Sequence, residues 1–302
     1  MIGFRLPAAH SIYLKGKTAM KLCFNTSAYG RHPLDYALKQ IAGFGFWGVE
    51  MMAERPHAFP ADFDAARRAE TRKLLEDLKL HPISILSSDC HRDWGYDKMF
   101  EPSYINKDAS IRAKRVELTK EVIDLAADLG CPCVQTGAGI IANGGFPLPR
   151  DAWNYLVACM EELADYGKSK NVRVSMEAEP STVVETTIDM ARLMKDVNSE
   201  WIGLTYDVGH VAVLGDDLIK SIDLLHEHIF NVHIEDICGR THLHLIPGEG
   251  LGTLNLRRLL EEFKYVGYQG TVTCDLYSQV EDPNYAAQRS YAYLAPIFEE
   301  LN

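Results

Sequence analysis

Long apolar runs and an excess of basic residues are both missing from the 302 residues of this chain. No stretch approaches the roughly 18 consecutive apolar residues of a membrane-spanning helix. Residues 1–20 lack an apolar signal core and a small-residue cleavage site, so we expect a cytoplasmic protein. Lysine and arginine number 31 against 42 acidic residues, which gives a net charge of −11. That charge repels phosphate groups and argues against nucleic acid and anionic membranes as partners.

The chain also lacks a cysteine pattern that would indicate disulfides. Its seven cysteines are an odd number, and Cys23, Cys133 and Cys274 lie inside apolar, strand-like runs. This usage is typical of reduced packing cysteines. No Pro- or Ser-rich linker or low-complexity segment divides the sequence. We therefore expect an N-terminal extension at residues 1–20 and one domain over residues 21–302.

Short apolar runs alternate with longer amphipathic runs along the chain. The apolar runs predict strands at 21–26, 46–51, 82–87, 132–136, 172–178, 201–207, 229–235 and 270–276. The amphipathic runs predict helices near 34–44, 62–80, 108–130, 150–170, 185–197, 215–228, 254–266 and 283–301. This alternation predicts an α/β fold, a single-domain (β/α)8 TIM barrel. An open doubly wound sheet usually has a GxGxxG turn after its first strand, and the sequence here is NTSAYG.

Cap residues support the predicted helix boundaries. Glycine favours the left-handed conformation in which many helices end, and an aspartate side chain can accept hydrogen bonds at a helix start. The glycines are Gly45, Gly130 and Gly267, and the aspartates are Asp62, Asp108 and Asp216.

Acidic residues and one histidine stand where the last four predicted strands end. The fifth strand ends in Glu177, the sixth in Asp207, the seventh in His233 and the eighth in Asp275. Active sites of parallel barrels lie at the carboxyl ends of the strands, so these side chains should meet at one mouth. Carboxylates with an imidazole suit a divalent ion such as Mn²⁺, Co²⁺, Mg²⁺ or Zn²⁺.

Five segments around these residues resemble the xylose isomerase-like sugar isomerase/epimerase superfamily. They are MEAEP, YDVGH, NVHIED, HLIPGEG and GYQGTVTCDLY, and the resemblance covers residues 21–300. The superfamily also includes ketose 3-epimerases, inosose dehydratase and an apurinic endonuclease branch. The resemblance implies a barrel that holds a divalent metal through Glu177, Asp207, His233 and Asp275. Its last ligand is usually glutamate, and Asp275 is shorter by one methylene.

The same resemblance implies contacts with substrate. His210 stands where related epimerases have a substrate-binding histidine, and Glu179 stands where xylose isomerase has a lysine. His242 and His244 resemble paired ligands of a second metal in the multi-metal branches. They could equally bind substrate hydroxyls or simply belong to a polar loop.

Two further residues lie in connections that follow predicted strands. Trp94, in the long segment after the third strand, could stack on a sugar or pack within that segment. His57 in ERPHAF resembles a metal-binding histidine of the endonuclease branch.

These features predict a metal-dependent isomerase of the epimerase type, acting on a ketose or keto sugar through an enediolate. Glu177 and Asp275 would remove and return the proton. The alternative is a lyase on the same metal site, which dehydrates an inosose or eliminates from a 3-keto glycoside. A third hypothesis, from a different class, is a sugar-binding barrel without catalysis. The expected partner is a small-molecule sugar, and a homo-oligomer is left open.

Overall fold

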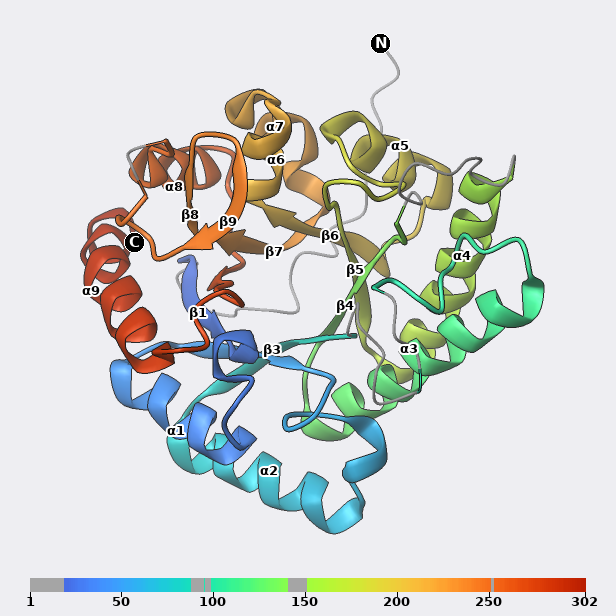
Figure 1. Ribbon diagram of the computed structural model, residues 1–302, viewed down its shortest axis with the longest axis horizontal. Helices are drawn as coiled ribbons and strands as arrows, with labels where there is room; N and C mark the ends of the chain where they lie inside the picture. The colour runs from blue at the N-terminus through green and yellow to red at the C-terminus, as the bar shows by residue number, and fades with distance from the viewer. Residues whose placement is uncertain (1–18, 88–94, 96–98, 141–150, 251–252) are drawn as a thin grey trace.

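Eight parallel strands form a closed barrel at the centre of the molecule (Figure 1). The computed structural model describes residues 19–87, 95, 99–140, 151–250 and 253–302. The barrel strands are β1 Lys21–Asn25, β2 Gly48–Met52, β3 His81–Leu86, β4 Cys133–Gly137, β5 Arg173–Glu177, β6 Ile202–Asp207, β7 Ile229–Ile234 and β10 Thr271–Cys274. Around the ring they follow the order β1-β10-β7-β6-β5-β4-β3-β2, which confirms the predicted TIM barrel.

The strands alternate between a polar inner face and an apolar outer face. In β5, Val174 and Met176 belong to the hydrophobic core, whereas the Ser175 hydroxyl bonds to the Thr205 hydroxyl of β6 at 2.8 Å. The period of two is that of any strand, in which successive side chains point to opposite faces. As a result, hydrogen-bonding side chains rather than aliphatic ones line the barrel interior near the carboxyl ends of the strands.

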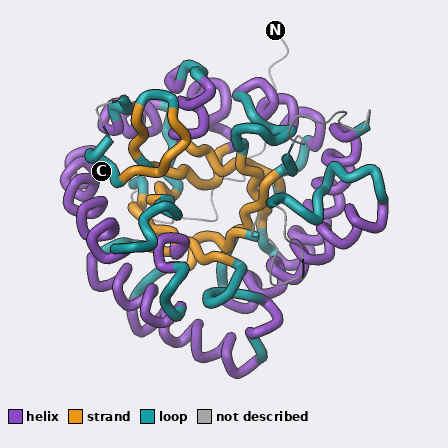
Figure 2. The backbone as a smooth tube through the Cα atoms, in the orientation of Figure 1, coloured by secondary structure: helices purple, strands orange, loops and turns teal. Residues whose placement is uncertain are grey.

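Helices surround the barrel as an outer ring (Figure 2). They are α1 Leu34–Phe44, α2 Ala65–Leu78, α3 Ala109–Leu129, α4 Ala152–Lys170, α5 Thr187–Val197, α6 Val208–Leu214, α7 Leu218–Leu225, α8 Leu256–Tyr265 and α9 Pro283–Leu301. Their buried faces pack apolar side chains on the outer face of the strands, which forms the main core. Within the described residues, no helix combines the length and the apolarity required to cross a membrane.

Most predicted boundaries agree with the structure, and two predicted helix caps are wrong. Helices α1 and α9 have the predicted bounds, and Gly45 and Gly130 end their helices with φ of +100° and +71°. The sequence predicts Asp62 at the start of α2, but Asp64 caps this helix and Asp62 lies in a preceding 3-10 turn. Asp217, rather than Asp216, caps α7. In both cases the correct aspartate lies one or two residues further along the chain, where the backbone is extended.

Two pieces of secondary structure beside the barrel mouth are additional to the prediction. The short helix α6 follows β6 directly, with Asp207 as its N-cap. After β7 the chain forms an antiparallel hairpin of β8 Asp236–Cys238 and β9 Thr241–Leu245. This hairpin carries His242 and His244. Trp94, by contrast, lies outside the described residues.

Candidate functional site

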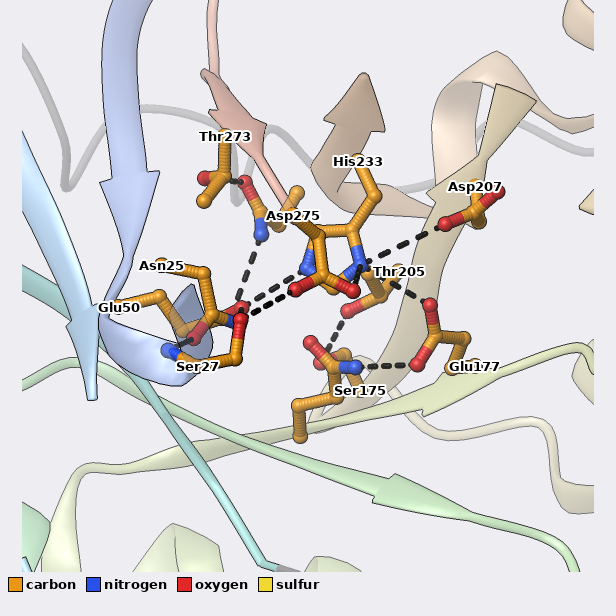
Figure 3. Close-up of polar contacts among 12 residues, drawn as sticks. Asn25, Ser27, Glu50, Ser175, Glu177, Thr205, Asp207, His233, Thr273 and Asp275 are labelled. Atoms are coloured by element: carbon orange, nitrogen blue, oxygen red, sulfur yellow. Dashed lines mark hydrogen bonds and ion pairs between the residues drawn. The ribbon is translucent and has the colours of Figure 1, made fainter. Parts of the chain in front are cut away.

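The structure brings the four predicted metal ligands together at the carboxyl end of the barrel (Figure 3). Glu177 and Asp207 are the last residues of β5 and β6, and Asp275 directly follows β10. His233 lies level with Asp207 in the register of β6 and β7. Glu177 pairs with Thr205, two residues before Asp207, and His233 pairs with Thr273, two residues before Asp275. The four side chains therefore lie within two residues of one another along neighbouring strands at the mouth.

The carboxylates gather around one nitrogen of His233. Its Nδ1 atom lies 2.9 Å from Glu177 Oε1, 3.7 Å from Asp207 Oδ2 and 3.9 Å from Asp275 Oδ2. Asp207 Oδ2 is buried and has no hydrogen-bond donor within the described structure. A buried carboxylate oxygen without a donor is costly unless a cation supplies the missing interaction. The donor set therefore fits a divalent ion beside His233 Nδ1.

Each carboxylate is also held by its second oxygen. Gln135 of β4 donates its side-chain amide to Glu177 Oε2. The Ser27 hydroxyl donates to Asp275 Oδ1 at 2.9 Å, and the His210 backbone N–H donates to Asp207 Oδ1 at 2.7 Å. These bonds leave the remaining carboxylate oxygens turned toward His233. Such supporting contacts orient the ligands of metal sites.

Buried negative charge dominates the mouth of the barrel. Five acidic residues are each at most 8 % exposed: Glu50, Glu177, Asp207, Glu235 and Asp275. Burial raises the pKa of Glu177 to about 8, although the neighbouring His233 opposes the shift. Burial and the charge of Asp207 also raise the pKa of Glu235 well above its usual value. A divalent cation would offset this charge and allow the carboxylates to ionise together.

The pKa values of His233 and Asp207 shift in the directions expected when oppositely charged groups lie close together. Burial alone would lower the pKa of His233, but Glu50 and Glu177 raise it well above the usual value. Burial would raise the pKa of Asp207, but the surrounding histidines hold it below the usual range.

Glu235 is a buried acid that the sequence analysis did not single out. It follows β7, and Gly209 in α6 lies directly against it. A Cβ atom at position 209 would overlap Glu235 Oε1, so only glycine permits this close approach. Gly209 therefore allows α6 to lie over the acidic cluster.

Three imidazoles form a second cluster beside the carboxylates. His210 Nε2 lies 3.3 Å from His244 Nε2, which lies 3.4 Å from His242 Nε2. His210 Nδ1 donates to the Ala178 carbonyl and His244 Nδ1 to the Asp275 carbonyl, at 2.9 and 2.7 Å. In the neutral rings both Nε2 atoms therefore carry lone pairs, which repel each other at 3.3 Å. A shared proton or a cation would relieve this repulsion, and the three nitrogens could hold an ion.

Other predicted residues take different positions. Glu179 follows β5, is half-buried, and contributes with burial to raising the pKa of Tyr277 to about 12. His57 belongs to none of the clusters of potential metal ligands among the described residues. Its Nε2–H instead faces the carbonyls of Tyr29 and His32, both at 3.2 Å. This geometry indicates a structural role for His57, which holds the segment that follows β1.

The supporting residues are the ones that the sequence analysis missed, namely Ser27, Glu50, Gln135 and Glu235. Each is a polar residue within or just after an apolar strand. That alternation is visible in the sequence, but only the fold shows what each of these residues contacts.

A family model described as "Xylose isomerase-like TIM barrel" matches residues 38–297. The chain therefore belongs to this family, as the motifs predicted.

Three known proteins illustrate the range of relatives. Fructoselysine 3-epimerase of Shigella flexneri is 24 % identical over 288 residues, which are 93 % of this chain and 99 % of the relative. Inosose dehydratase of Lacticaseibacillus casei is 23 % identical over 160 residues, 48 % of this chain and 53 % of that protein. The crystal structure of the IOLI protein "with a binding zinc atom" matches with a TM-score of 0.77 at 18 % identity, covering 94 % and 99 % of the two chains. This last similarity shows the shared fold.

Proposed function

We propose that this member of the xylose isomerase-like TIM barrel family is a metal-dependent epimerase of a ketose or keto sugar. The observation that carries the proposal is the placement of two carboxylates close to His233 Nδ1, those of Glu177 at 2.9 Å and Asp275 at 3.9 Å. Two carboxylates around one point can serve the two faces of a planar intermediate. An epimerase needs this arrangement because the proton leaves one face of a carbon and returns to the other.

The ion would be held by Glu177, Asp207, His233 and Asp275. The orphaned Asp207 Oδ2 and the excess of buried carboxylates support this assignment. When bound, a divalent ion such as Mn²⁺, Co²⁺, Mg²⁺ or Zn²⁺ polarises a substrate carbonyl and acidifies the neighbouring C–H group.

Glu177 and Asp275 would carry the proton. The Gln135 amide and the Ser27 hydroxyl each hold one oxygen of these carboxylates, so the second oxygen keeps a fixed direction. Glu177 in the metal-free site has a pKa of about 8 because it is buried, and a nearby dication would lower that value toward ionisation. Proton transfer by a positioned carboxylate contributes roughly 10²- to 10⁴-fold to the rate.

The remaining predicted residues would position the sugar. His210 and His244 present lone pairs at Nε2, which can accept hydrogen bonds from hydroxyl groups. His242 and Glu179, both partly exposed, stand at the edge of the same mouth. Trp94 remains a predicted contact on which a sugar face could stack.

Solvent isotope exchange tests the proposal. We expect the metal-loaded protein in deuterated water to introduce deuterium into one carbon of its substrate, sought by mass spectrometry among ketoses, inososes and 3-keto glycosides. An inverted, labelled product indicates an epimerase, whereas a released fragment or water indicates the alternative lyase. Turnover without deuterium in the product would contradict proton transfer by two carboxylates, because a hydride shift within the substrate incorporates no hydrogen from solvent.

A pair of variants separates proton transfer from the integrity of the fold. Glu177→Gln keeps nearly the same shape, and we expect it to lose deuterium exchange into the substrate. The metal content of this variant is measured in parallel. The control is Glu262→Gln in α8, because Glu262 is also buried and ion-paired but bonds to Arg258 outside the barrel. We expect this control to exchange at the wild-type rate.

A further inference from the structure

Glu50 is a fully buried carboxylate that none of the proposed chemical steps uses. It lies in β2 with no exposed surface, beside Asn25 (Figure 3). Within the described residues, its hydrogen-bond donors are the amides of Asn25 and Asn231 and the imidazole of His233. Isolated buried charges are costly, so a carboxylate retained here needs these donors.

The two amides fix the carboxylate independently of the histidine. Asn25 Nδ2 donates to Glu50 Oε1 at 2.8 Å, and Asn231 Nδ2 lies 3.4 Å from Oε2. The Asn231 amide is held from both sides, because its Oδ1 atom accepts from the hydroxyls of Thr271 and Thr273 at 2.8 and 3.0 Å while its NH₂ group faces Glu50. Two donors other than His233 therefore hold the Glu50 carboxylate in place.

This arrangement specifies one orientation of the His233 ring and places a hydrogen on its Nε2 atom. Both oxygens of Glu50 face amide donors, and Oε1 lies 2.8 Å from His233 Nε2, so Nε2 carries the hydrogen of this bond. A half-turn of the ring would replace both nitrogens by carbons and would break the bonds to Glu50 and Glu177 together. In the orientation observed, the second nitrogen, Nδ1, is the one that the three carboxylates surround.

We propose that Glu50 is a positioning residue that fixes the ring of His233, so that a divalent ion is bound through Nδ1. The inference rests on the proposed function only in assuming that an ion binds. Hydrogen bonds between the non-ligating nitrogen of a histidine and a carboxylate generally orient the ring and strengthen the ligand. Here the carboxylate comes from β2, on the other side of β1 and β10 from His233 in β7, so the bond crosses the interior of the barrel.

Metal titration of the full-length apoprotein tests this role. Glu50→Leu has a similar volume and cannot accept a hydrogen bond, so we expect the Kd for Mn²⁺ or Zn²⁺ to rise about 10- to 100-fold. Glu50→Gln keeps one acceptor oxygen for Nε2–H but turns its NH₂ group toward that of Asn231. We expect it to bind the ion more weakly than wild type and more tightly than Glu50→Leu. Glu262→Gln, the buried control in α8, should bind as wild type does.

A spectroscopic measurement separates positioning from general loss of structure. In the zinc-loaded wild type, the nitrogen NMR signals of the His233 ring should identify Nε2 as protonated and Nδ1 as the ligand. In Glu50→Leu this signature should be lost or replaced by a mixture. If Glu50→Leu fails to fold, Glu50→Gln provides the same comparison, with an expected shift of the Nε2–H signal.

The outcomes distinguish the inference from the function on which it rests. Wild-type affinity in both folded Glu50 variants, within twofold, together with an unchanged ring signature, would overturn the role of Glu50 alone. A wild-type chain that binds no divalent ion would overturn the proposed metal site and, with it, coordination through His233 Nδ1.

Discussion

Replacing His57 by glutamine should make the fold less sensitive to acid. His57 is 4 % exposed and its Nε2–H faces the backbone carbonyls of Tyr29 and His32. Burial lowers the pKa of His57 from 6.5 to about 4, and the two carbonyls only partly oppose this shift. The ring is therefore neutral in the folded protein at any pH well above 4.

The sign of the effect follows from proton binding. Between pH 6.5 and about 4 the unfolded chain takes up a proton at His57 and the folded protein does not. The free energy of unfolding therefore falls as the pH falls through this window and levels off below the folded-state pKa. A shift of this size corresponds to about 3 kcal/mol over the whole window and about 2 kcal/mol between pH 7 and pH 5.

Urea unfolding at pH 7 and pH 5, with a chelator present, measures this contribution. His57→Gln has an NH₂ group that can donate to the same carbonyls and cannot be protonated in this range. Between pH 7 and pH 5 we expect the free energy of unfolding to fall by about 2 kcal/mol more in the wild type than in the variant. His226→Gln is the matched control, since half-buried His226 also bonds to a backbone carbonyl, that of Asp223 at 2.8 Å. Equal losses in the wild type and His57→Gln would refute the argument.

Two other predictions concern the metal site and the substrate class. Protein purified without added metal should contain a divalent ion that Asp207→Ala loses, measured by elemental analysis; equal contents would contradict the assignment of Asp207 as a ligand. A second equivalent that disappears in His242→Ala would belong to the imidazole cluster instead. With a net charge of −11, the protein should not cleave an abasic DNA duplex with Mn²⁺ or Zn²⁺ in a gel assay, and efficient cleavage would overturn the choice of a sugar substrate.

The barrel could be predicted from the sequence because its signal is repeated eight times. An error of one or two residues at a strand end, such as 46–51 against Gly48–Met52, leaves the order and the mouth unchanged. Helix starts were less certain because neighbouring aspartates compete for the same role, as Asp62 and Asp64 show. Which of them is the cap depends on the backbone conformation, and composition does not reveal it.

Short elements at the mouth could not be predicted in the same way. The hairpin β8–β9 and the helix α6 span too few residues to show a period of their own. The sequence singled out His210, His242 and His244 separately, from their motifs. Only the fold brings the Nε2 atoms of His210 and His242 to 3.3 and 3.4 Å from that of His244.

The sequence reveals the proposed metal ligands more readily than the residues that support them, for a physical reason. Glu177, Asp207 and Asp275 stand where strands end, and a strand end is a local feature that the chain itself shows. Glu50 acts on a residue 183 positions away, and its role exists only once β2 and β7 belong to one closed ring. An acid inside an apolar strand breaks the expected pattern of a buried core. The sequence shows this exception at Glu50, but only the closed barrel explains it, because it places His233 within hydrogen-bond distance of Glu50.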